Sequence, residues 1–232
     1  MVRSSRTAQA CRAHWKGGNP YNRGMRTTDP PFVLGQDFNV NPMSTVVAKV
    51  FGDPQKPRTW GVYVLDVVQT SHSDTWKHGQ WMRSEKCREG RVSYANVPIA
   101  CDSTGCNYDP TRVKGSSVHT SSAAKTLVNL GFDARACALS DKGYPQNPRL
   151  LDSISMMHAL MREDRILVHG TRAFDLLRAL QEQQVTPKGL PVKVSHTASD
   201  KLSGPIDALR YLCWALFSAE FFERQKTAVT VL

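Results

Sequence analysis

The sequence has 232 residues, of which 41% are hydrophobic, so it is long enough for one large domain with a real core. Its formal net charge is +10, and the first thirty residues contribute six Lys or Arg against one Asp. No stretch approaches the roughly 18 to 20 uninterrupted apolar residues of a membrane span, and the N-terminus lacks the apolar core of a secretory signal. We therefore exclude a membrane protein and expect a soluble, intracellular chain. Its basic charge suits nucleic acid, although cationic solubility explains the same charge.

Residues 1–31 mix Arg, Ser, Gly, Asn and Pro without periodicity, which predicts a flexible basic arm or an interdomain linker. From Phe32 onward, residues 32–232 are expected to form one domain. "FVLGQDFNVNPMSTVVAKV" predicts an apolar approach to Asp37, a turn at "NVNP" and then a strand. "TWGVYVLDVVQTS" predicts a further strand, and a hairpin is the economical pairing of the two.

The middle of the chain alternates between helical and extended patterns. The polar segment from Ser73 to Glu89 begins like a helix, although Gly79 weakens it. "VPIACDSTG" predicts a short buried strand that runs into a tight turn. "TSSAAKTLVNLGF" predicts a helix with Ser/Thr capping at its start and Gly131 at its end, and "DARACALS" predicts another strand.

The C-terminal part predicts two amphipathic helices and a long final one. "NPRLLDSISMMHALMRE" and "TRAFDLLRALQEQQ" show helical periodicity, with a short extended piece, "RILVHG", between them. The final helix is expected from about Ile206 to Arg224. Strands that alternate with helices predict an α/β sheet with at least some parallel strands. The apolar stripes of the two amphipathic helices are expected to comprise Leu150, Leu151, Ile154, Met157, Leu160 and Met161 in the first and Phe174, Leu177 and Leu180 in the second.

The six cysteines form no CxxC pair and no zinc-ribbon spacing, which indicates reduced thiols. Cys137 in "ARACAL" and Cys213 in "YLCWAL" lie within apolar runs, where a free thiol packs as a small hydrophobe.

Three acidic residues are candidates for a catalytic or metal-binding site: Asp37 in "GQDFNVNP", Asp102 in "IACDSTG" and Asp207 in "PIDALRY". Each has an ordinary explanation as a turn, cap or edge residue, and Asp207 as a first-turn residue that meets the helix macrodipole. Asp66 in "YVLDVV" is expected on an exposed strand face. Together, however, three Asp without a Cys/His pattern suit Mg²⁺ or Mn²⁺, and two such ions about 3.5 to 4 Å apart can support phosphodiester cleavage. Without metal, at least one Asp should resist ionisation.

The order "GQDFNVNP", "IACDSTG" and "IDALRY" before an apolar helix resembles the nuclease domain of tailed-phage terminase large subunits, the DNA-packaging motors. "LVNLGFDA" and "NPRLLDSI" match the helix-Gly-strand passage and the following helix of that family. The resemblance covers roughly Phe32 to Phe222. It implies an α/β, RNase H-like fold: a mixed sheet with an antiparallel start and helices on both faces.

The resemblance also implies a metal site with two ions of Mg²⁺ or Mn²⁺. Asp37 would bridge the metals from the first strand, Asp102 would supply the second ligand, and Asp207 the third from the last helix. The activity implied is that of a metal-dependent endonuclease cutting double-stranded DNA with little sequence preference. Two alternatives stay open: another RNase H-like nuclease, such as a junction resolvase or an RNA-hybrid nuclease, and a basic DNA-binding or scaffold domain whose carboxylates are structural.

The sequence departs from the family at two points. No GxxxxGK[ST] phosphate loop occurs, so we expect an excised nuclease domain with residues 1–31 as the remnant of an interdomain connection. In the full-length protein the resemblance implies an ATPase motor domain, a small terminase subunit and a portal as partners, in the cytoplasm of the infected bacterial host. Many relatives also carry an acidic or His residue shortly before the final Asp, where this chain has "SGP"; Asp200 and His196 are the nearest substitutes as metal ligands.

Several basic and aromatic residues have weaker claims. Arg112, Lys114, Lys142 and Arg149 could line a DNA groove, with solvated surface charge as the equal alternative. The "DSTG" turn could present backbone N–H groups to a phosphate, although ordinary turn chemistry explains it better. The remaining candidates, which are expected to be packing, surface or interface residues, are His119, His158, His169, Trp76, Trp81 and Trp214.

Overall fold

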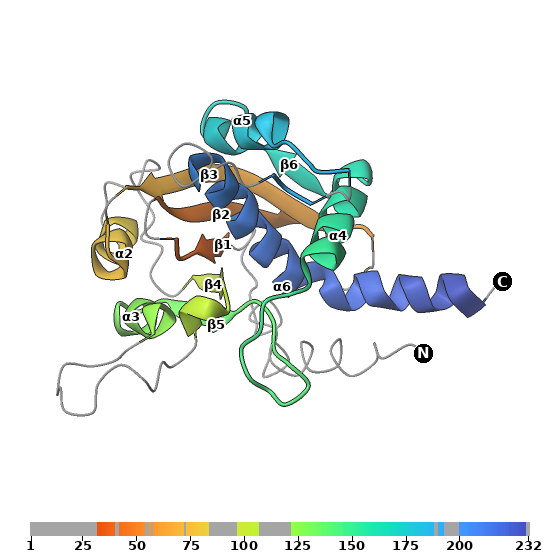
Figure 1. Cartoon of the computed structure of the whole chain (residues 1–232), viewed down its shortest axis with the longest axis horizontal. Coiled ribbons are helices and arrows are strands. Elements are labelled where there is room, and N and C mark those ends of the chain that lie inside the picture. The colour runs from red at the N-terminus through yellow and green to blue at the C-terminus, as the bar shows by residue number, and fades with distance from the viewer. Residues whose placement is uncertain are drawn as a thin grey trace.

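A computed structural model describes residues 32–39, 42–53, 56, 58–71, 73–83, 97–106, 122–187, 190–192 and 200–230. The predicted basic arm at 1–31 lies outside these residues, so the predicted division of the chain at Phe32 stays a prediction. The fold is built on a six-stranded sheet in the order β5-β4-β1-β2-β3-β6 (Figure 1). The strands are β1 (Phe32–Asp37), β2 (Met43–Phe51), β3 (Gly61–Thr70), β4 (Pro98–Cys101), β5 (Asp133–Ala136) and β6 (Ile166–Val168).

The sheet is mixed. β1, β2 and β3 are antiparallel neighbours, whereas β4 pairs with β1, β5 with β4, and β6 with β3 in parallel. The predicted hairpin of β2 and β3 is confirmed, and so is the expectation of some parallel strands. The expectation for Asp66 is wrong: its side chain is buried in β3 beside a bulge at Val47/Ala48, and its Oδ1 accepts from the Val67 N–H at 2.8 Å. Both faces of the sheet are covered at this point and residues 64–68 of β3 are all buried, so the strand has no exposed face for Asp66.

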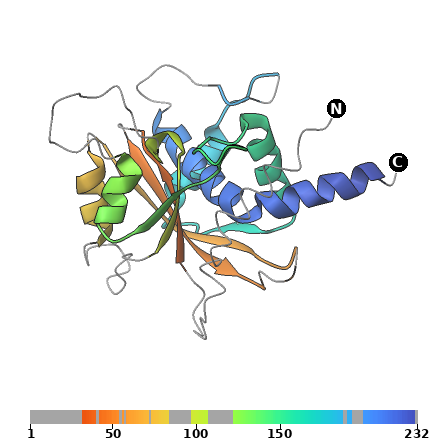
Figure 2. The same ribbon diagram turned by 90° about the horizontal axis from the view of Figure 1, so that it is seen from below.

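The helices lie on both faces of the sheet, as expected (Figure 2). α2 (Thr75–Arg83) and α3 (Ala123–Asn129) cover one face, and α4 (Leu150–Arg162), α5 (Phe174–Glu182) and α6 (Asp200–Thr230) cover the other. The core is accordingly split in two by the sheet: Val33 of β1 packs with α4, α5 and α6, and its neighbour Leu34 packs with α2 and α3. This is the period-two alternation of a strand with two covered faces.

The long helix α6 crosses β1 at very close range. A Cβ built on Gly35 would lie 2.2 Å from the backbone oxygen of Ala208, so only glycine allows this approach. α6 begins at Asp200 rather than near Ile206, and Asp207 therefore lies two turns inside the helix. The first-turn macrodipole explanation for its charge is wrong, because that effect fades within the first turn.

The predicted stripes of the two amphipathic helices are only partly right. Leu151 and Phe174 are more than half exposed, whereas Ser153 and Met156 of α4 and Leu176 of α5 are buried. Each of these helices packs mainly against α6, so the covered side is narrower and rotated from the one that hydrophobicity indicates. Cys137 and Cys213 are buried free thiols, as expected. None of the helices in the described part of the chain combines the length and apolar character of a membrane span.

Candidate metal centre

Asp37 and Asp102 lie at the carboxyl ends of neighbouring parallel strands. β1 and β4 pair Gln36 with Cys101, and the Asp102 N–H donates to the Gln36 carbonyl at 2.9 Å. Each aspartate is the next residue after this pair, and both side chains are buried, 2% and 8% exposed. The backbone pairing itself therefore brings two of the three predicted aspartates together.

Asp207 reaches the same place from α6. The residue after it, Ala208, is the one that packs on Gly35, two positions before Asp37. Burial, then the Asp207 carboxylate and then the Asp102 carboxylate raise the pKa of Asp37 to about 8, against smaller opposing effects of Arg210 and of a hydrogen bond from Asn39. The expectation that one Asp would resist ionisation without metal applies to Asp37.

The two strand-end carboxylates are held by neighbours that sequence reasoning missed. Asn39 donates its Nδ2 to Asp37 Oδ2 at 2.6 Å. Asp102 Oδ1 accepts from the Thr104 N–H at 2.9 Å and from Asn147 Nδ2 at 2.7 Å, and Asp102 Oδ2 accepts from the Thr104 hydroxyl. Asn147 in turn accepts from the Ser103 N–H at 2.8 Å. The "DSTG" turn thus closes on Asp102 itself, in the one-turn 3₁₀ helix Thr104–Cys106, and ordinary turn chemistry is the better explanation for it.

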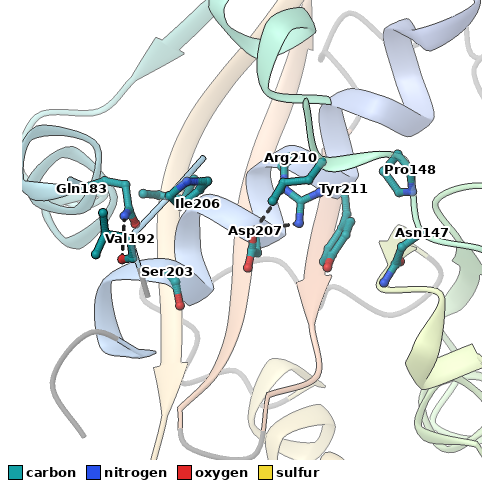
Figure 3. A pocket seen from close by; sticks show the side chains of 11 residues that line it. Asn147, Pro148, Gln183, Val192, Ser203, Ile206, Asp207, Arg210 and Tyr211 are labelled. Atoms are coloured by element: carbon teal, nitrogen blue, oxygen red, sulfur yellow. Dashed lines mark hydrogen bonds and ion pairs between the residues drawn. The ribbon is translucent and has the colours of Figure 1, made fainter. Parts of the chain in front are cut away.

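Asp207, the third carboxylate, forms an ion pair that was not predicted from the sequence. Arg210, one turn further along α6, donates its Nε and Nη2 to Asp207 Oδ1 at 3.1 and 2.8 Å (Figure 3). Its guanidinium also lies 4.7 Å from the centre of the Tyr211 ring. The spacing in "DALRY" allows an i, i+3 pair, and this was the only signal for it.

A pocket of about 260 Å³ opens beside these residues. In Figure 3, Asp207, Arg210 and Tyr211 of α6 lie in the middle of its lining, with Asn147 and Pro148 to their right. The remaining wall is largely apolar and is formed by Leu150, Gln183, Pro191, Val192, Ser203 and Ile206.

The residue types at this site suit a hard divalent cation. The donors are carboxylate oxygens, and burial together with the Asp207 and Asp102 carboxylates raises the pKa of Asp37, a penalty on its charged form that a bound cation would offset. Gly204 of α6 packs closely on β2 beside the site, since a Cβ there would collide with the Ser44 hydroxyl and would lie 3.6 Å from Asp37 Oδ2. Yet within the described residues no three His, Cys, Asp or Glu side chains are grouped so that they could hold a metal ion. One oxygen of Asp207, Oδ1, is already paired with Arg210.

The other predicted site residues fall into two groups. Lys142 and Arg149 are exposed, and Arg149 lies directly before α4, two residues after Asn147. Asp200 is the first residue of α6, but its side chain lies outside the described residues, as do Arg112, Lys114, His119 and His196 entirely. Among the residues expected to serve packing or the surface, His158 and Trp76 are exposed and Trp214 is buried.

Neither a protein-family model nor a curated protein sequence matches this chain. Three solved structures are similar to it. The nuclease domain of the P22 large terminase is similar with a TM-score of 0.53 and 17% identity, over 81% of this chain and 82% of that one. The large terminase nuclease domain of bacteriophage SPP1, with bound Mn, gives a TM-score of 0.45 and 16% identity over 83% and 88% of the two chains. That of thermophilic phage G20c, with bound magnesium, gives 0.43 and 15% over 82% of each.

The fold assignment rests on the first of these comparisons, because the other two TM-scores lie below 0.5. Most of both chains superimposes, and the mixed sheet with helices on both faces is the architecture that the sequence resemblance implied. The chain therefore has the mixed α/β fold of the P22 large terminase nuclease domain.

Proposed function

We propose that this domain is a metal-dependent endonuclease that cleaves double-stranded DNA during viral genome packaging. The observation that supports it best is that Asp207 of α6 lies near the adjacent strand ends that carry Asp37 and Asp102, close enough for its carboxylate to raise the pKa of Asp37. Asp37 and Asp102 are both buried, and burying neighbouring carboxylates is costly unless a cation joins them. The fold shared with the P22 domain is consistent with this use of the site.

The chain's own residues would prepare the site for the reaction. Thr104 and Asn147 hold Asp102, Asn39 holds Asp37, and Arg210 holds Asp207, so each carboxylate has a defined orientation. Two ions of Mg²⁺ or Mn²⁺ would supply an activated water and stabilise the leaving oxygen of the phosphodiester. Asp37, central and most deeply buried, is the carboxylate we assign to both ions. Asp200 or His196 would be the additional ligand.

DNA would approach over the exposed basic residues near Asn147. Lys142 and Arg149 are exposed there, and we assign Arg112 and Lys114 to the same role. Cations of this kind contact phosphates, which carry no sequence information, so we expect little sequence preference and a steep dependence on salt. In its biological setting the domain would act with an ATPase motor domain, a small terminase subunit and a portal, in the cytoplasm of an infected bacterium.

Plasmid cleavage tests the proposal. We expect the protein to linearise and degrade plasmid in Mn²⁺ or Mg²⁺, to be inactive in EDTA, and to lose activity as Asp102→Asn. Asp175→Asn, which removes an exposed carboxylate from α5, is the matched control and should cleave normally. Cleavage that ignores both EDTA and Asp102→Asn would rule out the metal-site mechanism.

The same assay separates the alternatives. Preference for a four-way junction or for an RNA–DNA hybrid over duplex DNA would identify another RNase H-like nuclease. Salt-sensitive binding of duplex without cleavage in any divalent cation would identify a DNA-binding or scaffold domain.

A further inference from the structure

Arg210 places a positive charge inside the acidic cluster. Its side chain is 7% exposed, and its guanidinium touches Asp207 directly. Burial by itself lowers the pKa of Arg210, but Asp207 and Tyr211 outweigh that and raise the pKa above its ordinary value. The cluster therefore contains three carboxylates and one permanent cation.

The guanidinium is fixed from several sides. Besides the two N–H donors to Asp207 Oδ1, its Nη1 donates to the Ser153 hydroxyl at 3.1 Å. Ser153 donates in turn to the Leu150 carbonyl at 2.9 Å, in the first turn of α4. The Tyr211 ring covers one side of the guanidinium. The packing of α4 against α6 therefore fixes the position of the Arg210 guanidinium, which cannot move freely when Asp207 moves.

Both donors use the same oxygen of Asp207. Among the described residues no hydrogen bond to Asp207 Oδ2 is found, so this is the oxygen that Asp207 can offer to a cation. Arg210 thus orients the carboxylate. A guanidinium also repels a divalent ion bound to that carboxylate, strongly so where the surroundings are buried and the dielectric is low.

We propose that Arg210 is a positioning residue with a second effect: it turns Asp207 toward the cation and, as a built-in counter-charge, weakens the binding of that cation. The inference rests on the proposed metal site. The two effects have opposite signs in an experiment. Loss of orientation lowers cleavage, and loss of positive charge tightens cation binding. A residue that served only the stability of the fold would move both in the same direction.

The test measures Mn²⁺ binding, from the free Mn²⁺ signal in electron paramagnetic resonance, beside cleavage at saturating Mn²⁺. Arg210→Gln should bind Mn²⁺ about tenfold more tightly or better, because one positive charge is gone from the site, and cleave at least about tenfold more slowly. Arg210→Lys keeps the charge but not the paired donors, so its Mn²⁺ affinity should stay within about twofold while its cleavage falls about tenfold. Arg178→Gln, which removes an exposed arginine from α5, should change neither.

Weaker or unchanged Mn²⁺ binding by Arg210→Gln would refute the proposal that Arg210 weakens cation binding. Normal cleavage by Arg210→Lys would refute its positioning role. If Arg210→Gln does not fold, the double variant Asp207→Asn/Arg210→Gln, which removes both partners of the buried pair, is compared with Asp207→Asn alone. The double variant should bind Mn²⁺ the more tightly, and equal or weaker binding overturns the inference. Failure of the proposed function looks different: the unaltered protein itself would neither bind Mn²⁺ nor cleave.

Discussion

Asp37 and Asp102 end neighbouring parallel strands in matching register, and the Asp102 N–H donates to the residue before Asp37 at 2.9 Å. Paired strands lie about 4.8 Å apart, so the backbone keeps these two carboxylates close whatever the side chains do. Their repulsion is built into the sheet. Asp207 of α6 adds a third negative charge. The helix can approach β1 this closely only because Gly35 has no side chain.

The first prediction concerns the electrostatic repulsion between these three carboxylates in the absence of metal. The pKa of Asp37 in the folded protein, about 8, lies above its usual 3.8, so between these pH values the folded state keeps a proton that the unfolded state has lost. In EDTA the free energy of unfolding should therefore fall as the pH rises from about 4 to about 8, by a few kcal/mol. Asp37→Asn carries no such proton, so its free energy of unfolding should not show this fall.

Thermal melts in EDTA at pH 5 and pH 8 check this prediction. Asp37→Asn should melt higher than the unaltered protein at pH 8 and should not cleave plasmid. Asp102→Asn and Asp207→Asn should also abolish cleavage with the fold intact. A large loss of stability in all three variants would contradict the idea that the cluster is strained without a cation.

The second prediction concerns a buried histidine behind the site. Burial lowers the pKa of His78 to about 4, and its two ring nitrogens lie 2.7 and 2.6 Å from the hydroxyls of Thr70 and Thr45. Thr45 continues the network to Gln36, whose Nε2 donates to the Asp37 carbonyl. The pKa of His78 is lower in the folded state than in the unfolded state. The contribution of neutral His78 to the free energy of unfolding is therefore complete above about pH 6.5 and is lost as the pH falls toward 4.

Urea unfolding between pH 4 and 7 measures that effect, in the Asp37→Asn background so that the opposite trend of Asp37 is absent. We expect a loss of about 3 kcal/mol over this range for the protein with His78, and a much flatter curve for His78→Gln. His158→Gln, an exposed histidine on α4, serves as the control and should keep the full slope.

The third prediction concerns the crossing of α6 over β1. Gly35→Ala would force its Cβ to within 2.2 Å of the Ala208 oxygen, a backbone atom that can only move with the helix. We expect a loss of roughly 2 to 4 kcal/mol in stability, typical of overpacking a core, and a loss of cleavage because Asp207 moves with α6. Gly170→Ala, where a Cβ meets nothing within 4 Å, should be nearly neutral in the same denaturation and cleavage assays.

The fourth prediction concerns Asn147, which connects the loop before α4 with Asp102. Asn147→Ala removes the donor to Asp102 Oδ1 and leaves the buried Ser103 N–H without its acceptor. We expect a stability loss of about 1 to 3 kcal/mol and a drop in cleavage rate of about tenfold or more. Rescue by Asn147→Ser, but not by Asn147→Ala, would support a hydrogen-bonding role; equal activity of both with the unaltered protein would refute it.

The fifth prediction concerns DNA binding. Arg149→Ala and Lys142→Ala each remove one exposed cation, so each should weaken binding of a catalytically inactive Asp102→Asn protein to duplex DNA, equally for different sequences. The slope of log K against log salt should become shallower by about one for each phosphate that the variant no longer neutralises. Arg178→Ala, on α5, is the control. Unchanged slopes for both variants would remove these residues from the DNA surface.

Much of this architecture could be predicted from the sequence because the signals are local. Alternating and continuous apolar runs identified β2, β3 and β4, and Ser122 caps α3 as the Ser/Thr pattern indicated. The three motifs around Asp37, Asp102 and Asp207 carried the resemblance to terminase nucleases, and the similarity to the P22 domain confirms the fold that this resemblance implied. Their role as metal ligands stays a prediction.

Only the tertiary structure decided how the site is completed. The burial of Asp66 and the hydrogen bond from Asn147 to Asp102 both depend on contacts between segments far apart in the chain. Arg210 shows the physical reason. Its spacing from Asp207 is local and readable, but its anchorage to Ser153 and its burial arise from the packing of α4 on α6, which no short stretch of sequence encodes.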